Sequence, residues 1–266
     1  MKSLLSKLGF HPFHIVDVSP WPILASLSLF SVIINTFYAL CYSSILELTI
    51  SLSSLIMVIY QWWRDVVRES TYQGFHSNNV SKGLYLGICM FILSEVMFFF
   101  SVFFSYFFTS LNPDTELGST WPPTGVQPME YMGAPMLNSI ILLSSGVSIT
   151  WAHHCLLTSD YKNCLNGMYL TIMLGFLFSY FQFEEYLSCY FTMSDSVYGS
   201  LFFIATGFHG LHVIIGAVMI SISTIRIGML QMSKKHHIGF ESSAWYWHFV
   251  DVVWMFLFIC IYWWGY

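Results

Sequence analysis

Apolar residues occur along the chain in seven long runs that are separated by short polar segments. The runs cover about residues 21–41, 45–63, 83–108, 134–157, 165–187, 197–225 and 242–264. A membrane helix needs about 20 apolar residues to cross a hydrocarbon core of roughly 30 Å, and these runs meet that length. The pattern therefore predicts an all-α membrane protein with seven transmembrane helices and little chain left over for a soluble domain.

The composition agrees with a membrane location. Of the 266 residues, 56% are hydrophobic and only 9% are charged, whereas about a quarter of the residues are charged in soluble domains. The longest polar segment, about residues 109–133, is rich in Pro and Gly, which predicts an ordered, turn-rich loop. The six cysteines form no C-x-x-C pair, so we expect neither a disulfide framework nor a cysteine metal site.

The charged residues are divided unevenly between the two sides of the predicted membrane. With seven spans, the N-terminus and the loops after the second, fourth and sixth spans share one side, and these segments carry all nine Lys and Arg residues. Basic residues collect on the inner side of membrane proteins. The N-terminus is therefore predicted to lie inside and the C-terminus outside. The leader shows no signal-peptide pattern, which favours insertion where the protein is made, in a bacterium or an organelle.

Glu95 interrupts the very apolar stretch of residues 92–108. Counted from Gly83, it lies about 18 Å into a hydrocarbon core of about 30 Å, and no basic residue lies one turn away. A charged carboxylate at this depth costs several kcal/mol. We expect Glu95 to be buried, largely protonated at pH 7 and turned toward the helix bundle or lipid. Proton exchange, a lipid or helix contact, and a structural hydrogen bond are the alternative roles.

The inner end of the second span carries a basic and aromatic cluster. Arg64 and Arg68 lie one turn apart beneath Trp62 and Trp63. The guanidinium fork suits phosphate and Trp prefers the membrane interface, so the cluster predicts a site for an anionic phospholipid. Generic snorkelling with ion pairs along the helix is the alternative. The predicted companions on the same side are His76, Lys82 and Arg226.

Ten histidines raise the question of a haem or metal site. His209 and His212 lie three residues apart on one helix face, as do His248 and Asp251. One face of one helix cannot supply both axial ligands of a haem. For His209 and His212 we expect hydrogen bonds between helices, with metal ligation as the alternative. For His248 and Asp251 we expect helix packing or proton exchange near the inner surface. No metal and no redox cofactor is assigned to this chain.

Several long strings in the sequence carry a family resemblance. They include YQWWRDVVREST, ILSEVMFF, WPPTG, SGVSITWAHH, IATGFHGLHVIIG and AWYWHFVDVVW. In sequence and in order they closely resemble subunit III of the haem-copper cytochrome c oxidases, especially the mitochondrial form. The resemblance runs from about Pro12 to the C-terminus.

The resemblance implies a particular arrangement of the seven helices. Residues 1–80, with the first two helices, would be separated by a phospholipid-filled cleft from a five-helix bundle formed by residues 81–266. Glu95 would be the family's buried carboxylate, which reacts with apolar carbodiimide. The positions that match the family's lipid-contacting surface are Trp62, Trp63, Arg64, Arg68, His76 and Arg226.

The resemblance also implies a function. The chain would be a subunit without a redox metal, bind phospholipid, support proton uptake and pack against subunit I, which holds the haems and copper. It would lie in the mitochondrial inner membrane with its N-terminus in the matrix, or in the bacterial plasma membrane if it is not organellar. Two alternatives stay open: subunit III of a quinol oxidase, and a proton-coupled transporter, although the internal repeats usual in transporters are not visible.

Small residues on two spans predict where subunit I packs. They allow the backbones of neighbouring helices to approach closely. On the third span they lie beside Glu95, and on the sixth span they lie around His209. These residues are Gly87, Ser94, Ser101, Ser105, Gly207, Gly210 and Gly216.

Overall fold

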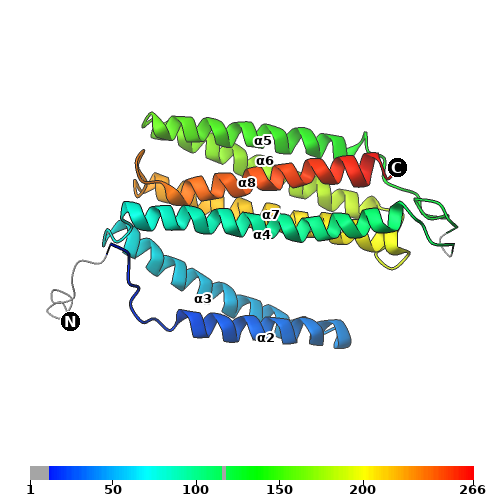
Figure 1. Ribbon diagram of the computed structural model, residues 1–266, viewed down its shortest axis with the longest axis horizontal. Helices are drawn as coiled ribbons and strands as arrows, with labels where there is room; N and C mark the ends of the chain where they lie inside the picture. The colour runs from blue at the N-terminus through cyan, green and yellow to red at the C-terminus, as the bar shows by residue number, and fades with distance from the viewer. Residues whose placement is uncertain (1–11, 116–117) are drawn as a thin grey trace. The chain divides into compact units, whose positions relative to one another are not determined.

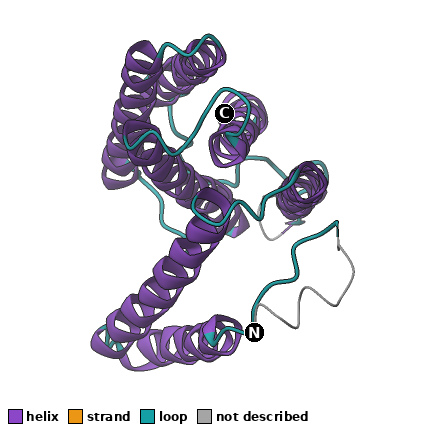
Figure 2. Cartoon of the chain, turned by 90° about the vertical axis from the view of Figure 1, so that its left-hand side faces the viewer, coloured by secondary structure: helices purple, strands orange, loops and turns teal. Residues whose placement is uncertain are grey.

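The computed structural model describes residues 12–115 and 118–266, and nearly all of their regular structure is helical (Figure 2). Seven of the described helices are long and apolar enough to cross a membrane, so the predicted number of spans is confirmed. The helices are α2 (Trp21–Tyr42), α3 (Leu46–Thr71), α4 (Asn78–Ser110), α5 (Ala134–Leu157), α6 (Tyr161–Ser188), α7 (Val197–Gly228) and α8 (Ile238–Leu257), which continues into the π-helix η2 (Phe258–Trp263).

Two helix ends differ from the hydropathy pattern. Helix α3 runs to Thr71, eight residues beyond the predicted apolar run, so Arg64 and Arg68 lie on this helix, one turn apart as predicted. Helix α8 begins at Ile238, four residues before the predicted span. His248 therefore lies ten residues into α8, a rise of about 15 Å, and is not at the inner end of the helix as the sequence indicated.

The chain forms two compact units, Met1–Leu84 and Tyr85–Tyr266. In the first unit, α2 packs along α3 (Figure 1). Trp21, the first residue of α2, donates from Nε1 to Asp65 Oδ2 on α3 at 2.7 Å. The segment before α2 is held by His14, whose ring stacks on Phe75 with 4.7 Å between ring centroids. None of the residues of α2 is buried.

In the second unit, α5 packs on α6, α6 on α7, α7 on α8 and α8 on α5. Four helices thus close a bundle around two large indoles. The Trp247 Nε1 donates to Ser145 Oγ at 2.8 Å, and the Trp254 Nε1 donates to Ser139 Oγ at 3.0 Å. These bonds satisfy polar atoms that would be costly to bury alone.

The Trp247 ring requires glycine on two neighbouring helices. A Cβ atom at Gly175 on α6 or at Gly216 on α7 would lie 2.8 Å from this ring, whereas a Cβ at Gly210 would meet nothing within 4 Å. The prediction that Gly216 faces another protein chain is therefore wrong, because Trp247 of the same chain fills that space.

Helix α4 joins the bundle mainly through side chains at separate levels. Tyr85 donates from Oη to Glu241 Oε2 on α8 at 2.5 Å, and Tyr106 accepts from Trp121 Nε1 at 3.2 Å. The small residues of the predicted stripe on α4 are all exposed in this chain. These residues are Gly87, Ser94, Ser101 and Ser105.

Candidate functional site

Glu95 on α4 faces His212 on α7. The distance from Glu95 Oε2 to His212 Nε2 is 2.9 Å. The Glu95 side chain is 23% exposed and the His212 side chain 9%, so the pair lies at the edge of the bundle. The sequence shows no basic residue one turn from Glu95 on the same helix. The partner is an imidazole from another helix, 117 residues further along the chain.

The second ring nitrogen of His212 fixes the proton count of the pair. Its Nδ1 lies 2.6 Å from the carbonyl oxygen of Phe208, and since a carbonyl only accepts, Nδ1 carries a proton. A single further proton then lies between Nε2 and the Glu95 carboxyl. It forms either a neutral acid with a neutral imidazole or a carboxylate with an imidazolium. Both states have zero net charge. The cost of burying a charged carboxylate at this depth therefore does not require Glu95 to be neutral.

Aromatic rings surround this pair. The Phe99 ring lies edge-on to the imidazole of His212 at 5.0 Å between centroids, and the Tyr246 ring stacks on it at 6.2 Å. Such surroundings exclude water and strengthen electrostatic interactions. The arrangement can hold, donate or accept one proton inside a membrane.

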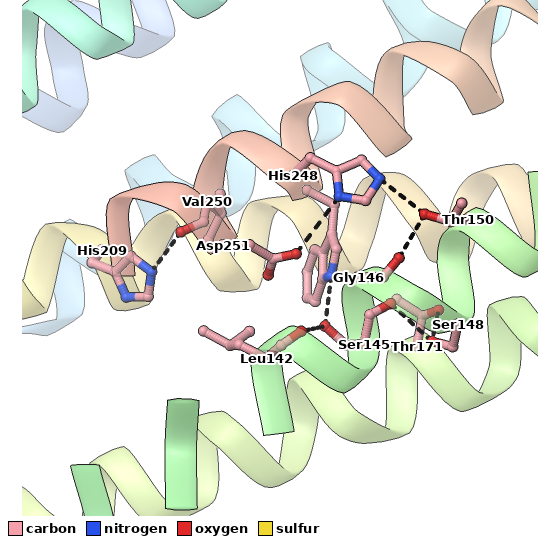
Figure 3. Close-up of polar contacts among 11 residues, drawn as sticks. Leu142, Ser145, Gly146, Ser148, Thr150, Thr171, His209, His248, Val250 and Asp251 are labelled. Carbon is pink, nitrogen blue, oxygen red and sulfur yellow. Dashed lines mark hydrogen bonds and ion pairs between the residues drawn. The ribbon is translucent and has the colours of Figure 1, made fainter. Parts of the chain in front are cut away.

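His209 lies one turn before His212 and points elsewhere. It is 1% exposed, and its Nε2 donates to the carbonyl oxygen of Val250 on α8 at 3.2 Å (Figure 3). Trp254 lies against its ring, with 5.2 Å between centroids. His209 and His212 therefore bind different partners and do not face one common ligand.

His248 lies between Asp251 and Thr150 (Figure 3). Its Nδ1 is 3.8 Å from Asp251 Oδ2, and its Nε2 is 3.4 Å from Thr150 Oγ1 on α5. The imidazole is 45% exposed, whereas the Asp251 side chain is 10% exposed. Gly146 on α5 leaves room for this carboxylate, because a Cβ there would lie 2.7 Å from Asp251 Oδ2. No motif or spacing in the sequence pointed to this requirement for glycine.

The first unit contains a pocket of about 770 Å³ between the segment before α2, the end of α3 and the start of α4. Its lining includes three of the residues predicted to bind lipid, Trp62, Arg68 and His76, together with the acidic residues Asp65 and Glu69. The pocket thus offers an indole wall, a guanidinium group and carboxylates within one space.

Arg64 and Trp63 do not belong to this lining. The Arg64 Nη2 donates instead to Asp65 Oδ1 at 3.1 Å, while Arg68 Nη1 lies 3.9 Å from the same oxygen. Both guanidinium groups therefore lie near one carboxylate oxygen, and a clamp of the two arginines on one phosphate stays a prediction. Arg226 belongs to the second unit, where its Nε donates to Gln231 Oε1 at 3.4 Å.

Within residues 12–115 and 118–266, no group of three His, Cys, Asp or Glu side chains is arranged to hold a metal ion. The functional groups that the structure brings together are the Glu95–His212 pair, the Asp251–His248 pair and the pocket around Arg68.

Comparison with known proteins shows the family of this chain. The family model described as cytochrome c oxidase subunit III matches residues 11–266. A protein named cytochrome c oxidase subunit 3 from Prototheca wickerhamii is 52% identical over 257 residues, which cover 96% of this chain and 98% of that protein. The protein of the same name from Balaenoptera musculus is 49% identical, over 96% of this chain and 98% of its own length. The one from Locusta migratoria is also 49% identical, over 98% of this chain and 100% of its own length. The chain therefore belongs to the cytochrome c oxidase subunit III family.

Proposed function

We propose that this chain is a core subunit of the proton-pumping oxidase that passes electrons from cytochrome c to oxygen. The observation that carries the proposal is the family match across residues 11–266. Haem and copper are expected in partner subunits, with this chain supplying structure, lipid binding and support for proton uptake. The family match argues against a proton-coupled transporter, because the family is that of an oxidase subunit.

We assign the chain to the mitochondrial inner membrane with its N-terminus in the matrix. The described basic residues support this orientation, since Arg226 lies at the end of α7 and Lys234 and Lys235 precede α8. Lys162 lies in the first turn of α6. Consecutive spans alternate in direction, so the end of α7 and the starts of α6 and α8 share one side, and basic residues collect on the inner side.

The pocket around Arg68 is proposed to bind a phospholipid headgroup. Arg68 and His76 suit the phosphate, Trp62 suits the acyl-chain boundary, and Glu69 with Asp65 offers a partner to a cationic headgroup amine. The pocket thus favours a zwitterionic headgroup such as ethanolamine over the purely anionic one predicted from the two arginines. The lipid-filled cleft that the family resemblance implies stays a prediction.

Arg64 provides a matched control for this pocket. Replacing Arg68 by Ala should reduce the phospholipid that co-purifies with the complex, as counted by mass spectrometry, because a lining cation is lost. Arg64→Ala removes the same charge one turn away, outside the lining, and should reduce bound lipid less. Equal lipid content in both variants and the wild type would remove the proposed headgroup site.

The Glu95–His212 pair is proposed to exchange a proton during turnover. Its single shared proton, its aromatic surroundings and its partial exposure support this role. We expect an apolar carbodiimide to label Glu95, since such reagents attack protonated carboxyls in apolar surroundings. The exposed stripe of small residues on α4, together with Gly210 on α7, is proposed to contact subunit I.

Purification through a tag on this chain tests the proposed function directly. The tagged chain should bring down a complex that shows haem and copper and oxidises cytochrome c. The chain separated from that complex should show no haem bands in a visible spectrum. Oxidation of quinol by the complex would favour the quinol oxidase alternative, and haem retained by the isolated chain would contradict the proposal.

A further inference from the structure

Another carboxyl is buried in the bundle, near the end of α6. Glu185 is 2% exposed. Tyr262, in η2 and also 2% exposed, donates from Oη to Glu185 Oε1 at 2.6 Å. This hydrogen bond joins α6 to the last helical turn of the chain, 77 residues later.

The remaining polar atoms of this cluster have no protein partner. Glu185 Oε2 and both amide atoms of Gln182, one turn earlier on α6, are buried without a hydrogen bond among the described residues. Buried polar groups are nearly always hydrogen-bonded. The Gln182 amide carries both a donor and an acceptor, so it is compatible with either form of Oε2. The charges around the carboxyl therefore decide which form is cheaper to bury.

Among the described residues of the elements that carry the cluster or pack beside it, every Lys and Arg lies far from Glu185. Lys162 is at the opposite end of α6, 23 residues from Glu185, a rise of about 35 Å. Arg226 lies in the last turn of α7, and residues 238–266 contain no Lys or Arg. The titratable neighbours besides Tyr262 are Tyr186 and Cys189, and neither carries a positive charge.

Glu185 therefore differs from Glu95. The Glu95 carboxyl has a basic imidazole at 2.9 Å, so it can be ionised in a neutral pair. The Glu185 carboxyl has only a neutral phenol at 2.6 Å. Burying an ionised carboxylate without a cation costs more than binding a proton does.

We propose that Glu185 is a second proton-binding site of this chain. Its side chain is a carboxylic acid, in which Oε1 accepts a hydrogen bond from the Tyr262 hydroxyl and Oε2 carries the bound proton. The site is separate from the Glu95–His212 pair and lies at the other end of the bundle from the basic residues. Its ligand is the proton itself, held by a buried carboxyl that also accepts a hydrogen bond from a phenol.

Infrared spectra of the assembled oxidase near neutral pH test this site. Subtracting the spectrum of Glu185→Gln from that of the wild type should reveal the carbonyl stretch of a protonated carboxylic acid. Glu184→Gln is the matched control, because Glu184 is the exposed neighbour and should contribute only carboxylate bands. If Glu185→Gln also removed only carboxylate bands, the proposal would be overturned.

Tyr262→Phe provides a second measurement that does not depend on assembly of the first variant. It removes the hydroxyl donor and leaves the carboxyl in place. The acid carbonyl band should move to higher frequency, because a carbonyl that loses a hydrogen bond becomes stiffer. An unchanged acid region in Tyr262→Phe would contradict the assignment of that proton to Glu185.

Discussion

The two units of this chain reach stability in different ways. Helix α2 of the first unit has no buried residue, whereas eleven residues of α8 in the second unit are buried, Trp247 and Trp254 among them. Both helices are about equally apolar in sequence, so hydrophobicity alone does not decide which helix is buried inside the protein. The difference lies in glycines and serines on neighbouring helices that receive the indoles of α8.

This contrast has a physical basis in the bilayer. Lipid tails are as apolar as Leu, so helices in a membrane associate through close packing and hydrogen bonds and gain little from hydrophobicity. The second unit supplies such packing itself. The first unit supplies a polar contact between α2 and α3, the Trp21–Asp65 bond of 2.7 Å, and many of its large apolar side chains are exposed in this chain.

The largest expected effect is a difference between substitutions at two glycines of α7. Gly216→Leu should disrupt the bundle, because even a Cβ there would lie 2.8 Å from the Trp247 ring, and overpacking of this kind costs about 1–3 kcal/mol or more. The chain should then be degraded and missing from membranes by immunoblot. A Cβ at Gly210 would meet no atom within 4 Å, so the chain with Gly210→Leu should accumulate but dissociate from the oxidase.

This pair of variants can break the comparison. If Gly216→Leu accumulated normally, the bundle would not depend on its Trp247 packing. If Gly210→Leu assembled with normal stability, the open face of α7 would not be a contact with subunit I.

A smaller loss is expected at the Trp254 hydrogen bond. Ser139→Ala leaves the buried indole Nε1 without its acceptor at 3.0 Å, which costs about 1–3 kcal/mol. Thermal unfolding of the complex, followed by loss of this subunit, should shift to lower temperature. Ser53→Ala on exposed α3 is the control and should shift it little, because that hydroxyl bonds only to its own helix. Equal shifts would argue against the role of buried serines.

The Glu95–His212 pair should affect turnover more than assembly. Glu95→Gln keeps the size of the side chain and a hydrogen-bond donor to His212 Nε2, so the oxidase should assemble and reduce oxygen. The loss should appear in proton-pumping efficiency, measured in vesicles as the pH change per oxygen reduced, or in the number of turnovers before inactivation, measured with an oxygen electrode. A fully assembled Glu95→Gln complex unable to reduce oxygen would mean that this carboxyl belongs to the chemistry itself.

The smallest expected effect lies in the first unit. Trp21→Phe removes the indole donor to Asp65 and should cost about 1 kcal/mol, concentrated in the segment before α2. Limited proteolysis should cut that segment faster, while oxygen reduction and the second unit stay unchanged. Tyr42→Phe at the other end of α2 is the control. Faster cleavage of both variants would show that the segment is not held by Trp21.

The sequence determined the features that depend on local composition. Seven apolar runs of sufficient length predicted the seven helices, since crossing a bilayer requires length and apolarity and not a particular partner. The segregation of all nine basic residues to one set of loops predicted the orientation, because basic residues collect on the inner side of membrane proteins. The family motifs fixed the identity of the chain, and the subunit III match to residues 11–266 confirmed it.

Tertiary structure decided which groups meet. Glu95 appeared to lack a cation because its partner His212 comes from a helix 117 residues away. Arg64 and Arg68 appeared equivalent, but the pocket receives only Arg68, since residues one turn apart on a helix share a face only approximately. Gly210 and Gly216 appeared equally open, yet Trp247 closes one of them. Contacts between distant segments depend on how helices rotate and pack against one another, and hydropathy along one helix carries no information about that rotation.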